Sequence, residues 1–246
     1  MSEFSENSKA FLHRTGILFG ADAMQKLASC HVLLAGAGGV GGYAAEALAR
    51  GGIRALTVYD PDSVHPTNLN RQILALNSTC GKLKTDCLYS RLADINPQLE
   101  LNLHPEALTA ENIPSVLDSN NFDYVIDAID PINEKCFLLA ACYNRKIPVI
   151  SAMGAGCRLD PSQVKYADIS KTNNCRLAKS VRSKLKKEYG ITGGIECVYS
   201  SEPPIPEAVL AETPNNRPTI GSSSFMPGIF GLFLAGRVLC KLAGKM

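Results

Sequence analysis

Along the first 152 residues of this 246-residue chain, short apolar runs alternate with longer segments that mix apolar and polar positions. HVLLA at 31–35 is a short, nearly continuous apolar run, as expected of a parallel strand that is buried on both faces. The longer segments have the length of helices and stop at signals such as Gly or Asn-Pro. The pattern predicts strands at 31–35, 55–60, 99–104 and 122–130 and in IPVISA, with helices at 39–52, 81–97, 112–119 and 133–146.

Strands that alternate with helices predict an α/β fold: a Rossmann-like, doubly wound, mainly parallel sheet with helices on both faces. After residue 152 the alternation loosens, and strands QVKYADIS and GIECVYSS flank a basic helix, CRLAKSVRSKLKKEYG. A final helix is expected at about 223–243. We expect one ATP-binding domain over 1–246, with a nucleotide-binding half at 1–152, a substrate and dimer half at 153–246, and a mobile Pro-rich loop at about 202–218.

Composition narrows the class of protein. The formal net charge of +2 gives no bulk attraction to nucleic acid, although a local basic patch is compatible with it. The nine cysteines have no C-x-x-C spacing, and the polar N-terminus does not resemble a signal peptide, so we expect reduced thiols and a cytoplasmic protein. The uncharged run from Phe225 to Gly236 is shorter than the ~20 residues that span a bilayer, which leaves peripheral membrane contact as the minor alternative.

A glycine-rich turn follows the first predicted strand. Gly36, Gly38 and Gly41 satisfy G-x-G-x-x-G, which lets backbone amides approach a pyrophosphate at a helix N-terminus. Asp60 ends the second predicted strand, where a carboxylate can bind ribose hydroxyls. These residues alone fit an NAD-dependent dehydrogenase as well as an ATP-dependent enzyme.

The stretch YDPDSVHPTNLNRQIL favours ATP over NAD. Arg71 can form a fork with phosphate oxygens and Asn68 can hydrogen-bond the same groups. Lys84, at the start of the next helix, can neutralise a further phosphate. Asp130 is expected to end the fourth strand, at the edge where ligands bind, and a carboxylate that faces a triphosphate suits Mg²⁺.

The motifs GAGGVGG, DPD, TNLNRQ, GKLK and IDAID together resemble the ubiquitin-activating-enzyme-like family, which includes the bacterial thiamine and molybdopterin sulfur-carrier adenylyltransferases. The resemblance covers essentially the whole chain and implies adenylation of a carboxylate with ATP. It implies a homodimer, in which Arg14 reaches the partner's ATP site and acts there with Arg71, Lys84 and Asp130. The glycine motif and the resemblance together predict a nucleotide site of Gly36, Gly38, Gly39, Gly41, Asp60, Asp62, Asn68, Arg71, Lys84 and, through Mg²⁺, Asp130.

The second half narrows the resemblance. Sulfur-carrier adenylyltransferases carry two C-x-x-C pairs that bind zinc, and this chain has none, so we expect no zinc. The segments GAGCRLDPSQVKYADISKTNNCRLAKSVRSKLKKEYGI, GGIECVYSSE and GSSSFMPGIFGLFLAG instead resemble the tRNA threonylcarbamoyladenosine dehydratases. That resemblance implies a tRNA substrate whose threonylcarbamoyl group is cyclised through an acyl-adenylate.

Several alternatives stay open. The chain can instead activate the C-terminal glycine of a ubiquitin-like sulfur carrier, or be a scaffold with a residual nucleotide site. A sulfur-relay protein or a cysteine desulfurase is a further candidate partner of the chain. Cys197 is either a nucleophile that forms a thioester or a buried strand cysteine. The basic helix offers five side chains that either contact tRNA phosphates or form a solvated face: Lys179, Arg182, Lys184, Lys186 and Lys187.

Overall fold

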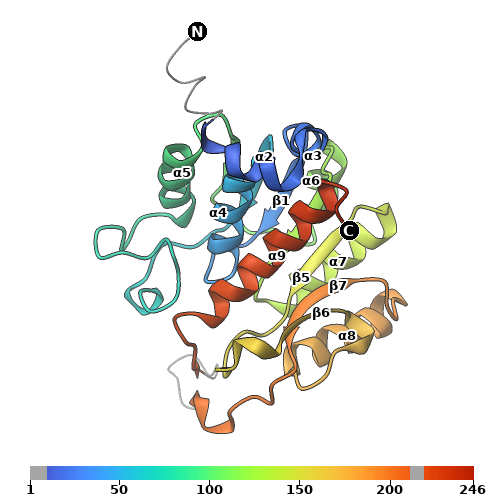
Figure 1. Cartoon of the computed structure of the whole chain (residues 1–246). Coiled ribbons are helices and arrows are strands. Elements are labelled where there is room, and N and C mark those ends of the chain that lie inside the picture. Colours follow the sequence, from blue (N-terminus) through green and yellow to red (C-terminus); the bar gives the residue numbers. More distant parts are fainter. Residues whose placement is uncertain (1–9, 211–218) are drawn as a thin grey trace.

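A mostly parallel sheet forms the centre of the molecule (Figure 1). The computed structural model describes residues 10–210 and 219–246. Within those residues the sheet has seven strands in the order β3-β2-β1-β4-β5-β7-β6, and only β6 runs antiparallel to its neighbour. The strands are β1 His31–Ala35, β2 Ala55–Tyr59, β3 Glu100–His104, β4 Tyr124–Asp127, β5 Val149–Ala152, β6 Val164–Asp168 and β7 Glu196–Ser200.

Helices cover both faces of this sheet, which confirms the predicted fold class. The packing clusters place α3, α4, α5 and α9 on one face and α6, α7 and α8 on the other. The α-helices are α2 His13–Phe19, α3 Ala21–Leu27, α4 Gly41–Gly51, α5 Lys84–Ile95, α6 Ile113–Ser119, α7 Ile132–Arg145, α8 Arg176–Tyr189 and α9 Met226–Leu242. Short 3-10 turns lie at Pro66–Asn68, Pro161–Gln163, Ile169–Lys171 and Pro206–Ala208.

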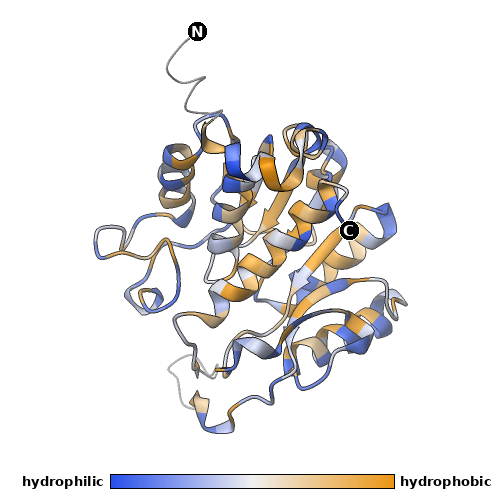
Figure 2. Ribbon diagram, in the orientation of Figure 1, coloured by the Kyte–Doolittle hydropathy of each residue, from blue (hydrophilic) through white to orange (hydrophobic). Residues whose placement is uncertain are grey.

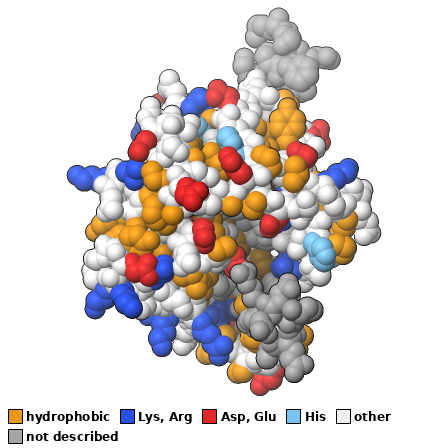
Figure 3. All heavy atoms as spheres, turned by 180° about the vertical axis from the view of Figure 1, so that it is seen from behind, with side chains coloured by type: hydrophobic (Ala, Val, Ile, Leu, Met, Phe, Trp, Pro, Cys, Tyr) orange, Lys and Arg blue, Asp and Glu red, His pale blue; other side chains and the backbone are white. Residues whose placement is uncertain are grey.

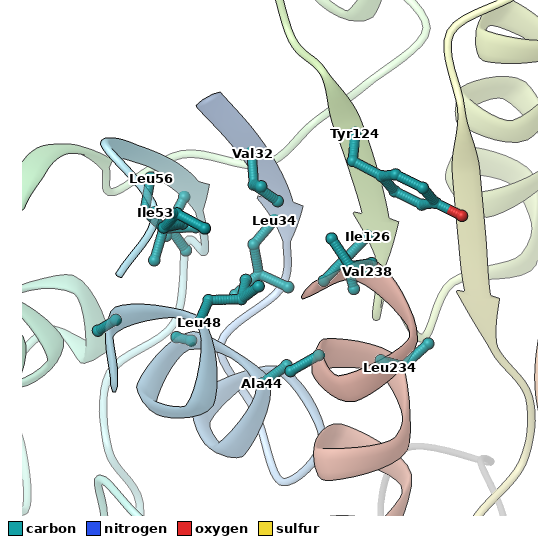
Figure 4. Close-up of a cluster of buried hydrophobic side chains, with 14 of the residues drawn as sticks. Val32, Leu34, Ala44, Leu48, Ile53, Leu56, Tyr124, Ile126, Leu234 and Val238 are labelled. Carbon is teal, nitrogen blue, oxygen red and sulfur yellow. The ribbon is translucent and has the colours of Figure 1, made fainter. Parts of the chain in front are cut away.

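The apolar run of β1 explains why both faces need a cover. Successive side chains of a strand point to opposite faces. Val32 and Leu34 therefore pack with α4 and α9 (Figure 4). Leu33 and Ala35 pack on the other side, with α6 and α7. In Figure 2 the central strands are orange while α8, at the margin, is largely blue.

The final helix, α9, lies against α4 and the sheet. Phe230 and Leu234 are fully buried there. Gly231 allows the close approach of the two helices, because a Cβ at this position would lie 2.3 Å from the carbonyl oxygen of Val40 in front of α4. Among the helices that the structure describes, none is long and apolar enough to cross a membrane.

Two regions differ from the sequence prediction. The fourth strand ends at Asp127 rather than at residue 130, because the Asp127 carboxylate accepts a hydrogen bond from the Ile129 amide at 3.0 Å and turns the chain. In the expected 202–218 loop, Val209–Leu210 (β8) pairs antiparallel with Thr219–Ile220 (β9). Residues 211–218 of that loop lie outside the described residues.

Candidate active site

The predicted nucleotide residues come together at one edge of the sheet. β1, β2 and β4 are parallel neighbours, and Ala35 is in register with both Tyr59 and Asp127. The residues that follow these three strands therefore share the carboxyl edge, where ligands bind in open α/β sheets. The segments brought together there are the glycine turn that begins at Gly36, the loop that begins at Asp60, and residues 128–131.

The glycine turn has no room for side chains at its two ends. Gly36 has a φ of +92°, and a Cβ there would lie 2.8 Å from the carbonyl oxygen of Ala128. A Cβ on Gly41, the first residue of α4, would lie 1.8 Å from the carbonyl oxygen of Gly36. The turn therefore packs tightly in front of α4 and leads into the N-terminus of that helix, which is the geometry that favours phosphate binding.

Asp60 joins the glycine turn to the next loop. Its carboxylate is buried and accepts hydrogen bonds from the amides of Ala37 at 2.6 Å and Asp62 at 2.9 Å. Each carboxylate oxygen has a second lone pair that can accept from a ligand. Asp60 therefore stabilises the glycine turn, and it also lies where the sequence predicts ribose binding.

Lys84 supplies a buried positive charge at this edge. Its side chain is 5% exposed, and its Nζ lies 2.6 Å from Asp62 Oδ2 and 3.5 Å from Asp60 Oδ1. The Asp62 side chain is 64% exposed, so it can turn aside while Asp60 keeps the ammonium in place. The two carboxylates therefore keep the Lys84 ammonium group at the position where it can bind an anionic ligand.

The segment that contains Asn68 and Arg71 folds over the glycine turn. A Cβ on Gly39 would lie 3.6 Å from Arg71 Cγ, so the arginine stem covers this glycine. Arg71 Nη1 donates to the carbonyl oxygen of Thr67 at 2.9 Å and to Asn70 Oδ1 at 2.8 Å. Asn68 Oδ1 accepts from the His65 amide at 3.0 Å and thereby closes the 3-10 turn.

Two buried polar side chains that directly follow predicted site residues were not identified from the sequence. Gln72 and Thr85 directly follow Arg71 and Lys84, and the oxygens Gln72 Oε1 and Thr85 Oγ1 are buried with no hydrogen-bond partner among the described residues. Buried polar atoms of a native structure normally have partners. The Gln72 side chain lies beside the glycine turn, since its Nε2 would be 3.8 Å from a Cβ on Gly38. A polar ligand in the cradle formed by the glycine turn, Asp60, Arg71 and Lys84 would offer this side chain a partner, so the residues present fit a nucleotide.

A buried group of polar side chains that the sequence analysis did not identify lies beside the end of β4: Lys135, Asp127 and Ser151. Lys135 is fully buried, and its Nζ lies 2.7 Å from Asp127 Oδ2 and 3.0 Å from the carbonyl oxygen of Ala152. Ser151 Oγ donates to the same Asp127 oxygen at 2.5 Å. Asp127 is thus neutralised inside the protein, whereas Asp130 is exposed at the rim.

Asp130 is the residue that the sequence predicts to bind Mg²⁺. The described residues contain no cluster of three His, Cys, Asp or Glu side chains that could hold a metal ion. Mg²⁺ typically binds through one or two carboxylates and completes its octahedron with water and substrate phosphates. Asp130, an exposed carboxylate in the loop after β4 at the ligand edge, would fit that mode of binding.

Comparison with known proteins identifies the family. Residues 12–246 match the model of the ThiF family. The chain belongs to the ThiF family.

Individual members of the family are similar over nearly the whole chain. The chain is 41% identical over 238 residues to tRNA threonylcarbamoyladenosine dehydratase of Bacillus subtilis, and the match covers 93% of each chain. It also resembles a crystal structure of the Escherichia coli tRNA N6-threonylcarbamoyladenosine dehydratase in complex with ATP, with a TM-score of 0.88, 35% identity and coverage of 96% of this chain and 95% of that chain. The corresponding complex with AMP gives a TM-score of 0.89 at 34% identity and covers 100% of this chain and 98% of that one.

Within this ThiF-family chain, Arg14 lies away from the nucleotide cradle. It is exposed on α2. The start of α2 packs at the far end of α4, where a Cβ on Gly52 would lie 2.9 Å from Leu12 Cδ1. The length of α4, about 16 Å at 1.5 Å per residue, separates that packing point from the glycine turn. The structure therefore does not bring Arg14 together with the other predicted nucleotide residues of the same chain.

Cys197 is buried in β7 of the ThiF-family domain. Its Sγ donates to the carbonyl oxygen of Ala167 at 3.4 Å, and burial raises the pKa of the thiol to about 12. A nucleophilic cysteine needs a depressed pKa and access to its substrate. Both observations favour the buried strand cysteine over the nucleophile.

The five basic residues of α8 differ in their surroundings. Arg182 turns inward, and its Nη1 donates to Thr172 Oγ1 at 2.6 Å and to the carbonyl oxygen of Ile169 at 3.2 Å. Lys184 pairs with Glu188 at 2.8 Å. Three of the five are exposed: Lys179, Lys186 and Lys187.

Proposed function

We propose that this chain is an ATP-dependent tRNA threonylcarbamoyladenosine dehydratase. The observation that carries the proposal is its similarity to the dehydratases of Bacillus subtilis and Escherichia coli over more than nine tenths of both chains. The intact cradle of glycine turn, arginine and lysine supports an active enzyme rather than a scaffold with a residual nucleotide site. The substrate is a threonylcarbamoyl group carried on an adenosine of tRNA.

ATP binding follows from the arrangement of the edge. The amides at the start of α4 meet the phosphates, and the guanidinium of Arg71 adds a planar pair of donors. Lys84 exchanges its hydrogen bond to Asp62 for one to a phosphate oxygen. Asp130 would hold Mg²⁺, which neutralises charge on the phosphates when it is bound.

The chemistry proceeds in two steps. A carboxylate oxygen of the threonyl group attacks the α-phosphorus of ATP, the bond to the β-phosphate oxygen breaks, and pyrophosphate leaves. An atom of the neighbouring carbamoyl group then attacks the activated carbonyl carbon, loses its proton and expels AMP. The net change in the nucleoside is the loss of one water. Hydroxide is a poor leaving group and AMP a good one, which is why the dehydration consumes ATP.

A shared active site in a homodimer completes this proposal. Arg14 is exposed and lies beyond the far end of α4 from the cradle of its own chain. The neighbouring side chains Ile17 and Leu18 are 73% and 79% exposed, which suits a helix that packs against a second subunit. In the dimer, Arg14 stabilises charge at the partner's phosphates.

Substrate-dependent release of pyrophosphate tests the proposal. With ATP and Mg²⁺, the purified protein should release pyrophosphate when tRNA that carries the linear threonylcarbamoyl group is added. The matched control is the same tRNA without the modification, which offers no carboxylate. Release that instead depends on a ubiquitin-like protein with a C-terminal glycine would support the sulfur-carrier alternative.

A further inference from the structure

A hollow of about 730 Å³ lies on the outer face of α8, beside the first turn of α7. It is a surface feature distinct from the nucleotide cradle. Most of its lining comes from one stripe of α8, in which residues recur every three or four positions, as neighbours on a helix face do. The lining residues are Ile132, Arg176, Lys179, Ser180, Ser183, Lys184, Lys187 and Glu188.

The charge of the hollow is strongly positive. Four of the lining side chains are cationic and one is anionic. Glu188, the anion, is engaged with Lys184 at 2.8 Å. Within the part of the chain that the structure describes, Arg176, Lys179 and Lys187 form no ion pair, and all three are exposed. In Figure 3, Lys and Arg side chains gather at the lower left, the side on which α8 lies in Figure 1 after the half-turn.

The position of the hollow connects it to the active site. Ile132, on its rim, is two residues beyond Asp130 at the end of the same short loop. Arg176 to Lys187 spans about 16 Å of helix at 1.5 Å per residue, enough to meet more than one phosphate. The hydroxyls of Ser180 and Ser183 lie between these cations and can donate to phosphate oxygens as well.

We infer that this hollow binds the sugar-phosphate backbone of the tRNA and thereby presents the modified adenosine to the adenylation edge. The inference rests on the proposed function and adds to it the surface that holds the RNA. It also assigns different roles to the basic residues of α8. Arg176, Lys179 and Lys187 contact the phosphates, whereas Arg182 stabilises the turn at residues 169–172 of the protein itself. A net charge of only +2 makes this local concentration of cations, rather than the whole molecule, the source of attraction.

Two triple variants with the same change in charge test the inference. The hollow variant carries Arg176→Gln, Lys179→Gln and Lys187→Gln. The control variant carries three substitutions at exposed lysines outside α8 and outside the hollow: Lys146→Gln, Lys165→Gln and Lys245→Gln. Affinity for a fluorescent tRNA transcript is measured by anisotropy across a series of KCl concentrations, and ATP affinity by calorimetry.

For the hollow variant we expect a tRNA affinity that is lower by roughly tenfold to a hundredfold at about 0.1 M salt. The slope of log affinity against log salt should be shallower by about two to three, because each phosphate that the protein no longer neutralises reduces it by about 0.7–0.9. The KM for modified tRNA should rise while kcat and ATP affinity stay close to wild type. The control variant should keep most of the wild-type slope and affinity.

Equal losses of affinity in the two variants, or none in either, would overturn the inference. So would loss of binding to phosphatidylserine vesicles in the hollow variant with tRNA binding unchanged, because the hollow would then be a membrane-binding surface. The binding assay is independent of turnover. A wild-type protein that binds tRNA through the hollow but does not dehydrate the nucleoside would contradict the proposed function while supporting this site.

Discussion

Replacing Lys135 by Met is expected to destabilise the protein severely. Methionine keeps most of the unbranched apolar stem but removes the ammonium group. The Asp127 carboxylate, which is fully buried, then loses the Nζ that lies 2.7 Å away. Only uncharged donors remain to it, the Ile129 amide at 3.0 Å and the Ser151 hydroxyl at 2.5 Å.

The magnitude follows from the cost of leaving a buried charge without its counter-ion. Removal of one partner of a buried ion pair typically costs about 3–5 kcal/mol of folding free energy. Total stabilities of domains are about 5–15 kcal/mol, so this is a large fraction. For a domain of this size, about 2–4 °C per kcal/mol converts the loss into a fall in Tm of about 6–20 °C.

Urea unfolding and scanning calorimetry measure the effect. The double variant Asp127→Asn with Lys135→Met should recover most of the stability, because the neutral amide leaves no charge to compensate. Lys165→Met, at an exposed lysine, is the matched control and should change stability by less than about 0.5 kcal/mol. A loss below about 1 kcal/mol in the single variant, or a double variant no more stable than the single one, would refute the reasoning.

Three other predictions address the site and the stability of the fold. Cys197→Ala should keep most of the dehydratase activity in a kinetic assay, since burial raises the pKa of the thiol to about 12. Complete loss of activity in a folded variant would support a mechanism in which Cys197 forms a thioester. Arg14→Ala and Asp130→Asn chains should each be inactive, but an equal mixture that has exchanged subunits should regain about a quarter of wild-type activity, because half of the dimers then have one complete site. No recovery after proven exchange would exclude a shared site. Burial raises the pKa of Glu196, but hydrogen bonds, chiefly from Arg237, outweigh it and hold the pKa below its usual range. Its stabilisation is therefore present above about pH 4.3 and is lost as the pH falls through the lower pKa of the folded state, so the deficit of Glu196→Gln in urea should shrink at acid pH; a constant deficit would contradict this.

The sequence predicts the sheet and its ligand edge well for a physical reason. A strand that is buried on both faces, such as β1, must be apolar at nearly every position, and this pattern is visible without a structure. The parallel order then places the ends of the strands together, so Gly36 and Asp60 could be assigned to one edge. The position of Asp130 in a loop could not be predicted in this way, because the strand is ended by a hydrogen bond from the Ile129 amide to the Asp127 side chain.

Buried charges were the main features that the pattern missed. Lys135 lies eight residues after Asp127, and no local rule pairs a lysine with a carboxylate at that distance along the chain. The inward orientation of the Arg182 side chain could have been predicted from the positions of the apolar residues in α8. Ala178 and Leu185, four residues before and three after it, are buried, so Arg182 borders the apolar stripe of α8.

The most direct test of the central claim is mass spectrometry of the tRNA nucleosides after incubation of the purified protein with ATP, Mg²⁺ and tRNA that carries linear threonylcarbamoyladenosine. The account predicts a nucleoside lighter by one water, with AMP and pyrophosphate formed in equal amounts to it. A control without ATP should leave the nucleoside at its original mass. An unchanged nucleoside in the complete reaction, with a protein that binds ATP and is folded, would contradict the account.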